Sequence, residues 1–218
     1  MNDLVKNKPR AYIVGEVEFY NCKISLNQNV LIPRQESEIL VFYALQRLKD
    51  CKGGVLLDLC TGSGCLGLAI KKARPDIQVI LSDISPLALE VAKKNGVVNE
   101  LDVEYLEGDL LAPLGHQKID YLICNPPYVT DFEYEHLDSS VRDYEPKLAL
   151  VGGNEGLDFY SALSKTLHAY INIGGKVFFE IGKDQGLKVI DLFSDPFWRK
   201  KEIIRDWAGH DRFVFLET

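Results

Sequence analysis

From residue 54 onward, the chain alternates short apolar runs with segments whose apolar residues recur at helical spacing. This alternation is typical of a parallel sheet with helices on both faces. The expected strands cover residues 55–59, 77–82, 103–106, 119–124, 175–181, 201–206 and 212–217. The expected helices cover residues 66–73, 86–95, 157–171 and 185–193. No helix separates the last two strands, so we expect them to pair as a hairpin and make one strand of a mostly parallel, seven-stranded α/β sheet antiparallel.

The residues before this alternation show two simpler patterns. Residues 16–26 alternate around Tyr20-Asn21 in the manner of a small β-hairpin. Residues 36–49 carry apolar side chains at helical spacing, with Ser37 as a candidate N-terminal cap. We therefore divide the 218 residues into a short N-terminal segment, 1–35, and one larger domain, 36–218.

A glycine-rich turn joins the first expected strand of the sheet to the helix that follows it. Its glycines, Gly62, Gly64 and Gly67, have the spacing G-x-G-x-x-G. The first two allow a sharp turn and close approach of a ligand to the backbone, and the third allows close packing of helix on strand. Asp83 ends the second strand, where a carboxylate can accept hydrogen bonds from both hydroxyls of a ribose. The turn therefore predicts a site for a ligand that contains adenosine.

Acidic residues lie at or just beyond the ends of three neighbouring strands and favour one such ligand over another. Asp58 precedes the glycines and would repel a pyrophosphate, but it can pair with an α-ammonium group. Asp109 follows the third strand and can accept a hydrogen bond from the adenine amine. With Asp83, these residues favour the cationic S-adenosylmethionine (SAM) over NAD. As an alternative, each acid taken singly is a helix cap or a turn residue.

The tetrapeptide Asn125-Pro126-Pro127-Tyr128 ends the fourth expected strand. Consecutive prolines cannot continue a central strand, so they end it in a stiff turn. The Asn125 side-chain oxygen and the Pro126 carbonyl can accept the two hydrogens of a planar –NH₂ group, and Tyr128 can cover its plane. This arrangement indicates methyl transfer to an amide or to a base amine. Taken alone, the tetrapeptide is equally consistent with an ordinary turn.

Composition narrows the class of protein further. The net charge is −7, which argues mildly against a protein that binds duplex nucleic acid. The five cysteines include no Cys-x-x-Cys pair, and the histidines lack metal-ligand spacing, so we expect reduced thiols and no metal site. We find no signal peptide and no long apolar run, and we therefore expect a cytoplasmic protein without a membrane span.

Several further stretches resemble one family, the HemK/PrmC methyltransferases, over residues 9–218. These enzymes are class I, Rossmann-like, SAM-dependent methyltransferases that carry Asn-Pro-Pro-Tyr and methylate the glutamine of the Gly-Gly-Gln motif in class I peptide chain release factors. The most discriminating stretches are Ile32-Pro-Arg34 and Glu145-Pro-x-x-Ala-Leu150. The others are Pro9–Gly15, Gly152–Asp158, Glu180–Gly186 and Gly209–Arg212.

The resemblance implies roles for individual residues. It assigns cofactor contacts, with SAM as donor and S-adenosylhomocysteine as product, to Cys60, Thr61, Gly62, Ser63, Gly64, Asp83, Leu110 and Asn125. It assigns the substrate glutamine to the segment Asn125–Tyr128, and residues 36–218 to the catalytic domain of an enzyme of translation termination. Two departures stand out. Only eight residues precede Pro9, so we expect the chain to lack the helical substrate-binding domain that the family usually carries there, and Gln35 replaces a proline. The nearby Glu36 and Glu38 are as consistent with a charged first helical turn as with catalysis.

Other functions remain open at this point. An amino-methyltransferase that acts on adenine or cytosine in DNA or RNA would need the same site for a planar –NH₂ group. The acidic net charge nevertheless favours a protein substrate, without a stable nucleic-acid partner. A SAM-binding scaffold without chemistry would have no need of the planar-amine pocket. A NAD-dependent dehydrogenase fits the glycine turn alone.

Overall fold

A computed structural model describes residues 7–218, and a seven-stranded sheet organises them in the order β5-β4-β3-β6-β7-β9-β8. The strands are β3 (Val55–Leu59), β4 (Gln78–Asp83), β5 (Glu104–Glu107), β6 (Ile119–Cys124), β7 (Ile171–Glu180), β8 (Lys200–Arg205) and β9 (Asp211–Glu217). β3 to β7 pair in parallel, whereas β9 lies between β7 and β8 and is antiparallel to both. The predicted sheet, with one antiparallel strand near the C-terminus, is confirmed.

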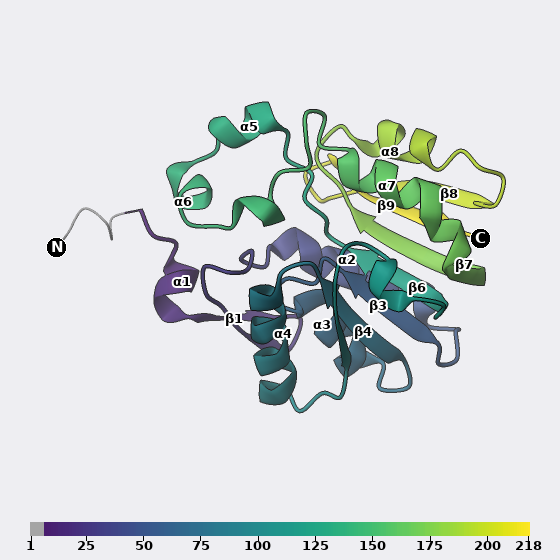
Figure 1. Cartoon of the computed structure of the whole chain (residues 1–218), viewed down its shortest axis with the longest axis horizontal. Helices are drawn as coiled ribbons and strands as arrows, with labels where there is room; N and C mark the ends of the chain where they lie inside the picture. The colour runs from purple at the N-terminus through teal and green to yellow at the C-terminus, as the bar shows by residue number, and fades with distance from the viewer. Residues whose placement is uncertain (1–6) are drawn as a thin grey trace.

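Helices cover both faces of this sheet, as predicted (Figure 1). The α-helices are α1 (Arg10–Val14), α2 (Gln35–Leu48), α3 (Cys65–Ala73), α4 (Pro86–Val98), α5 (Asp131–Glu135), α6 (Ser139–Arg142), α7 (Asp158–Thr166) and α8 (Gly186–Leu192). The short 3₁₀ helices are η2 (Ala112–Leu114), η3 (Lys147–Ala149) and η4 (Leu167–Ala169). One apolar core joins α2, α3 and α4 to one face of the sheet, and a second core joins α7 and α8 to the other.

The strand β3 shows why a continuous apolar run forms the centre of the sheet. Leu56 faces the core beneath α2 to α4, whereas Leu57 and Leu59 face the core beneath α7 and α8. All three leucines are at most 1% exposed. A strand covered on both faces carries apolar residues on both rather than at alternate positions, and the one charged residue of β3, Asp58, is fully buried.

Two local predictions are wrong, and tertiary contacts explain both. The predicted helix 157–171 ends at Thr166, because Ile171 pairs with Ile119 and already belongs to β7. Ser37 does not cap α2: Arg34 occupies the cap position without a side-chain cap bond, and Ser37 lies inside the helix, where it is 2% exposed.

The N-terminal hairpin is confirmed, with strands β1 (Glu16–Phe19) and β2 (Cys22–Ser25). Tyr20 and Asn21 both have positive φ, 43° and 65°, as a two-residue turn of type I′ requires. The hairpin packs on the core beneath α3 and α4, where Phe19 and Ile24 are at most 1% exposed. The division at residue 35 stays a prediction, and residues 1–6 lie outside the described part of the chain.

Asn95 of α4 and Asn99, the residue that caps this helix, cover the outer edge of β2. The Asn95 amide accepts from the Ser25 backbone nitrogen at 2.8 Å and donates to the Ser25 carbonyl at 3.1 Å. One helical turn later, Asn99 makes the same pair of bonds with Lys23, at 3.0 and 2.8 Å. Asn95 Nδ2 also donates to the Ser63 carbonyl at 2.8 Å, so one buried amide joins the hairpin to the glycine turn.

The described helices are short compared with a lipid bilayer. The longest, α2, has 14 residues and is therefore about 21 Å long, against about 30 Å for a hydrocarbon core. Within residues 7–218, no helix combines the length and the apolar character that a membrane span requires.

Candidate active site

A cavity of about 370 Å³ opens at the carboxyl ends of β3, β4 and β6. Its volume falls in the range of small-molecule sites. The chain proceeds from β3 outward to β4 and β5, and then returns to β6 on the other side of β3. Ligands of parallel α/β sheets bind at such a reversal of strand order, because the loops diverge there.

The glycine turn forms one wall of the cavity, and Asp83 holds it. Asp83 Oδ2 accepts from the Gly62 nitrogen at 2.8 Å, and Oδ1 accepts from the Ser85 nitrogen at 2.9 Å. Each oxygen retains a further acceptor site for a ligand. Burial raises the pKa of Asp83, while its backbone hydrogen bonds oppose that shift. A Cβ added to Gly62 would meet no atom within 4 Å, so the backbone there is open to a ligand.

Asp58 lies behind the glycine turn and not on the cavity surface. It is 0% exposed, and its Oδ2 accepts from the Thr61 hydroxyl at 2.6 Å and from the Gly67 nitrogen at 2.8 Å. Its Oδ1 is buried without a hydrogen-bond partner, and burial raises the pKa of Asp58 to about 7. The expected direct pairing of Asp58 with an ammonium group does not fit this position, since the carboxylate is used to fix the turn.

Most of the predicted cofactor residues line the cavity. These are Cys60, Thr61, Gly62, Ser63, Asp83, Asp109, Leu110 and Asn125. Gly64 lies outside the lining with Asp58, because the start of α3 packs there: a Cβ on Gly64 would approach Leu68 and Leu81. The predicted close packing at Gly67 is confirmed, since a Cβ there would lie 2.2 Å from Leu81 Cδ2.

The tetrapeptide after β6 is divided between the cavity and the interior. Asn125 and Pro127 line the cavity, whereas Pro126 is buried behind them. The Tyr128 ring lies against Gly182, and the Tyr128 carbonyl accepts from Gln185 Nε2 at 3.1 Å. Burial raises the pKa of the Tyr128 hydroxyl far above its usual range. The direct roles expected of Pro126 and Tyr128 stay predictions.

Sequence reasoning did not assign roles to several residues of the cavity wall. Ile84, next to Asp83, is 49% exposed and offers an apolar face to a ligand. Further walls come from the segments that resemble the HemK/PrmC family and from the residues next to them. Their lining residues are Val30, Leu31, Pro33, Pro146, Leu148, Ala149 and Phe159. Their motifs were visible in the sequence, but only the fold brings them to the same cavity.

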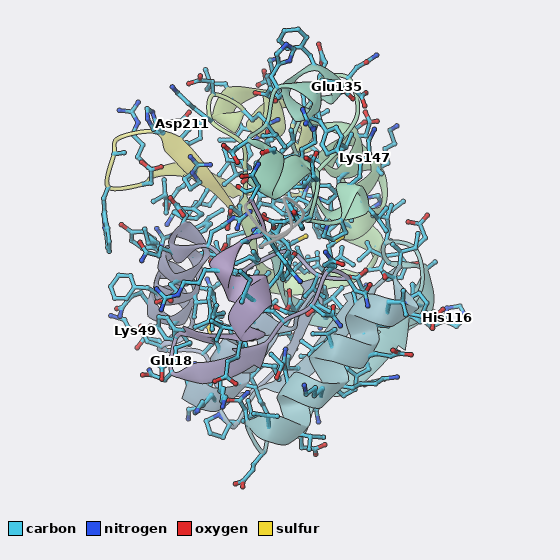
Figure 2. The ribbon with its side chains drawn as sticks, turned by 90° about the vertical axis from the view of Figure 1, so that its left-hand side faces the viewer. Glu18, Lys49, His116, Glu135, Lys147 and Asp211 are labelled. Atoms are coloured by element: carbon cyan, nitrogen blue, oxygen red, sulfur yellow. The ribbon has the colours of Figure 1, made fainter. Side chains whose placement is uncertain are left out.

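An ion pair between the buried Glu145 and the half-buried Arg34 connects two of these walls. Glu145 Oε1 accepts from Arg34 at 2.5 Å, and Oε2 accepts from the Ile32 nitrogen at 3.1 Å. The Glu145 side chain is 1% exposed and that of Arg34 is 35% exposed. Glu145 precedes the wall segment that includes η3, whose Lys147 appears with Glu135 in the upper part of Figure 2, above Glu18 of the hairpin. The pair therefore holds the segment before α2 against the segment that follows α6.

Arg34→Ala should lower the free energy of unfolding by about 3 kcal/mol, because it leaves the Glu145 carboxylate buried and unpaired. Chemical denaturation of the purified variant measures this loss. The control is Arg142→Ala, which removes an ion pair whose side chains are 37% and 51% exposed and should change stability by less than about 1 kcal/mol. Equal losses in the two variants would contradict the role given to the buried pair.

Within residues 7–218, no group of three or more histidine, cysteine, aspartate or glutamate side chains could hold a metal ion. The polar side chains that line the cavity include carboxylates, amides and hydroxyls. Acceptors outnumber donors among its polar side chains, which suits a ligand that carries hydroxyl, amine or cationic groups.

Comparison with known proteins first identifies the fold. A methyltransferase from Pyrococcus furiosus superposes with a TM-score of 0.65 at 17% identity, over 89% of this chain and 88% of its own. The family model described as "Methyltransferase small domain" matches residues 37–141. The fold is therefore that of the class I methyltransferases.

Curated relatives identify the family of this methyltransferase-like chain. The release factor glutamine methyltransferase of Chlamydia trachomatis is 43% identical over 96% of this chain and 72% of its own length. That of Enterococcus faecalis is 39% identical over 98% of this chain and 77% of its own length. The chain belongs to the release factor glutamine methyltransferases, and the resemblance seen in its motifs is confirmed.

Proposed function

We propose that this enzyme transfers a methyl group from SAM to the side-chain amide nitrogen of the glutamine in the Gly-Gly-Gln motif of class I peptide chain release factors. The observation that carries this proposal is the position of Asn125, a hydrogen-bonding amide on the wall of the same cavity that Asp83 and the glycine turn line. Family membership supports the choice of a glutamine over a nucleic-acid base.

The cavity residues fit SAM. Asp83 would accept hydrogen bonds from the ribose hydroxyls, and Ile84 would lie against the apolar faces of the nucleoside. Asp109 would accept from the adenine amine beside Leu110. The open backbone at Gly62 would allow close approach of the methionine portion. Asp58 would act at a distance, by fixing the turn rather than by contact.

Asn125 would orient the substrate amide. When bound, SAM supplies an electrophilic methyl group, so that an N–C bond forms as the S–C bond breaks and the amide nitrogen releases one proton. An amide nitrogen is a weak nucleophile, because its lone pair is delocalised into the carbonyl. Accepting its hydrogens at Asn125 Oδ1 and the Pro126 carbonyl would localise electron density on nitrogen and fix its direction of attack. Tyr128 would wall the glutamine pocket.

The proposed partner is a class I release factor, met as a free protein in the cytoplasm. A net charge of −7 gives no electrostatic advantage to a nucleic-acid substrate. We therefore expect no stable complex with DNA or RNA.

Incubation with methyl-labelled SAM tests the proposal. One reaction receives a purified class I release factor, one receives the same factor with its Gly-Gly-Gln glutamine replaced by alanine, and one receives DNA and RNA. We expect label on the unaltered factor alone. Label on nucleic acid would instead support an amino-methyltransferase, and a lack of label in every reaction would overturn the proposed function.

A further inference from the structure

One buried side chain, Ser37, connects Asn125 to the buried carboxylate of Glu180, and Ser37 also lines the cavity. Ser37 of α2 receives a hydrogen bond from Asn125 Nδ2 at 3.3 Å and donates one to Glu180 Oε2 at 2.7 Å. Ser37 is 2% exposed, and Glu180, the last residue of β7, is 1% exposed. Cys124 pairs with Phe179 in the sheet, so Asn125 and Glu180 leave neighbouring strands at the same level.

The directions of these bonds decide which atom of Asn125 faces the cavity. A serine hydroxyl has one hydrogen to donate, and an ionised carboxylate can only accept. With its hydrogen on Glu180, Ser37 can only accept from Asn125, and therefore binds the –NH₂ end of the amide. The oxygen and nitrogen of an amide are nearly the same size, so such a network determines the orientation of the side chain. Asn125 Oδ1 is left free to accept.

We propose that Glu180 and Ser37 are positioning residues that act through Asn125: the carboxylate orients the Ser37 hydroxyl, and Ser37 holds the amide with its oxygen toward the substrate. This proposal rests on the proposed function, since it concerns how Asn125 Oδ1 accepts a hydrogen bond from the N–H group of the substrate amide. Neither residue needs to touch the reacting atoms.

These two hydrogen bonds form a relay from Glu180 through Ser37 to Asn125, and the relay depends on the charge of Glu180. Burial raises the pKa of Glu180 to about 7, while the hydrogen bond from Ser37 opposes the shift. The other charged or titratable groups around it are Arg34, Glu36, Cys65, Tyr128, Tyr160 and Arg212. Above about pH 7 the ionised carboxylate accepts from Ser37. Below it, protonated Glu180 can donate to Ser37, whose hydrogen then turns toward Asn125 and selects the reversed amide.

Substitutions of Ser37 separate positioning from structure. Ser37→Ala should lower kcat about tenfold, the equivalent of one lost hydrogen bond, and change the Kd of SAM by less than about twofold. Ser37→Thr keeps the hydroxyl and should restore most of kcat. The control is Ser164→Ala, which removes a half-buried hydroxyl that bonds the Ser161 carbonyl outside the cavity lining and should leave kcat unchanged.

The pH dependence of kcat distinguishes a positioning role from a purely structural one, because loss of a structural role would leave this dependence unchanged. With saturating SAM, wild-type kcat should rise with pH through about 7 as Glu180 ionises. In Ser37→Ala and Glu180→Gln this rise should be absent. Asp58 has a pKa near the same value. It remains in every variant, so a rise that persists in both would belong to Asp58 and would overturn the proposal.

A measurement without substrate separates this proposal from the proposed function. In wild type, the side-chain amide NMR signals of Asn125, assigned with Asn125→Asp, should shift with pH around a midpoint near 7. In Ser37→Ala they should not. Signals that are insensitive to pH in wild type, or that titrate equally without the Ser37 hydroxyl, would overturn the relay even if release factor is methylated. Titration as expected, with no label on the release factor, would instead reject the proposed function alone.

Discussion

Asn125→Ala is expected to lower kcat for glutamine methylation by about 10²- to 10³-fold, the loss typical of removing one preorganised polar group from a reacting centre. The substrate amide would lose the acceptor that localises its electron density and sets its direction. The affinity for SAM should change little, because the glycine turn and Asp83 remain. Single-turnover rates and SAM affinity by calorimetry measure the two effects separately.

Asn172→Ala is the matched control for this substitution. Asn172 is also a half-buried asparagine, and its Nδ2 donates to Asp120 Oδ1 at 2.8 Å, away from the cavity lining. It should retain wild-type kcat. Turnover of Asn125→Ala near the wild-type rate would exclude Asn125 from the reacting centre and leave the backbone carbonyls as the acceptors to test next.

Asp83→Ala is expected to weaken SAM binding by at least about 100-fold. A carboxylate that accepts from two ribose hydroxyls makes two charge-assisted hydrogen bonds, each worth about 1.5–3 kcal/mol. Even the lower value gives about 3 kcal/mol in total, and tenfold in Kd corresponds to about 1.4 kcal/mol. The same substitution also releases the Gly62 nitrogen from its 2.8 Å bond, which loosens the turn. Equilibrium binding of SAM checks this result.

Glu107→Ala provides the control for Asp83→Ala. Glu107 ends β5 directly beside Asp83 in the sheet register, yet it is exposed and lies outside the cavity lining. Removing it takes away a negative charge at nearly the same place without touching the ligand. If both variants lost affinity equally, a general effect of charge would replace the specific ribose contact.

The strands and the glycine turn could be predicted because their signals are local. The apolar run of β3 and the spacing of Gly62, Gly64 and Gly67 are readable within ten residues or so. The helix α5 carried a readable signal that was missed: Thr130 and Glu133 form a capping box. The C-terminal end of helix 157–171 could not be predicted in this way, because the pairing of Ile119 with Ile171 joins residues far apart in the sequence.

The candidate site shows the same limit. Asp83 and Asn125 could be predicted as cavity residues, since each follows an expected strand directly. Asp58 lies inside the strand instead, where the turn folds back over its carboxylate and buries it, and this burial is not visible in the sequence. The partnership of Ser37 with Glu180 spans 143 residues of sequence and depends on the packing of α2 against β7, for which no local pattern exists.

The amide pairs of Asn95 and Asn99 with β2 have a consequence for self-association. An unpaired strand edge is a template on which another polypeptide can add a strand. Here each asparagine offers one acceptor and one donor at the spacing of a neighbouring strand, and so imitates that strand with side chains. An incoming β-segment would find Lys23 and Ser25 already saturated. Asn95 and Asn99 therefore protect this edge of β2 from the addition of another strand, since among residues 7–218 β2 pairs with β1 alone.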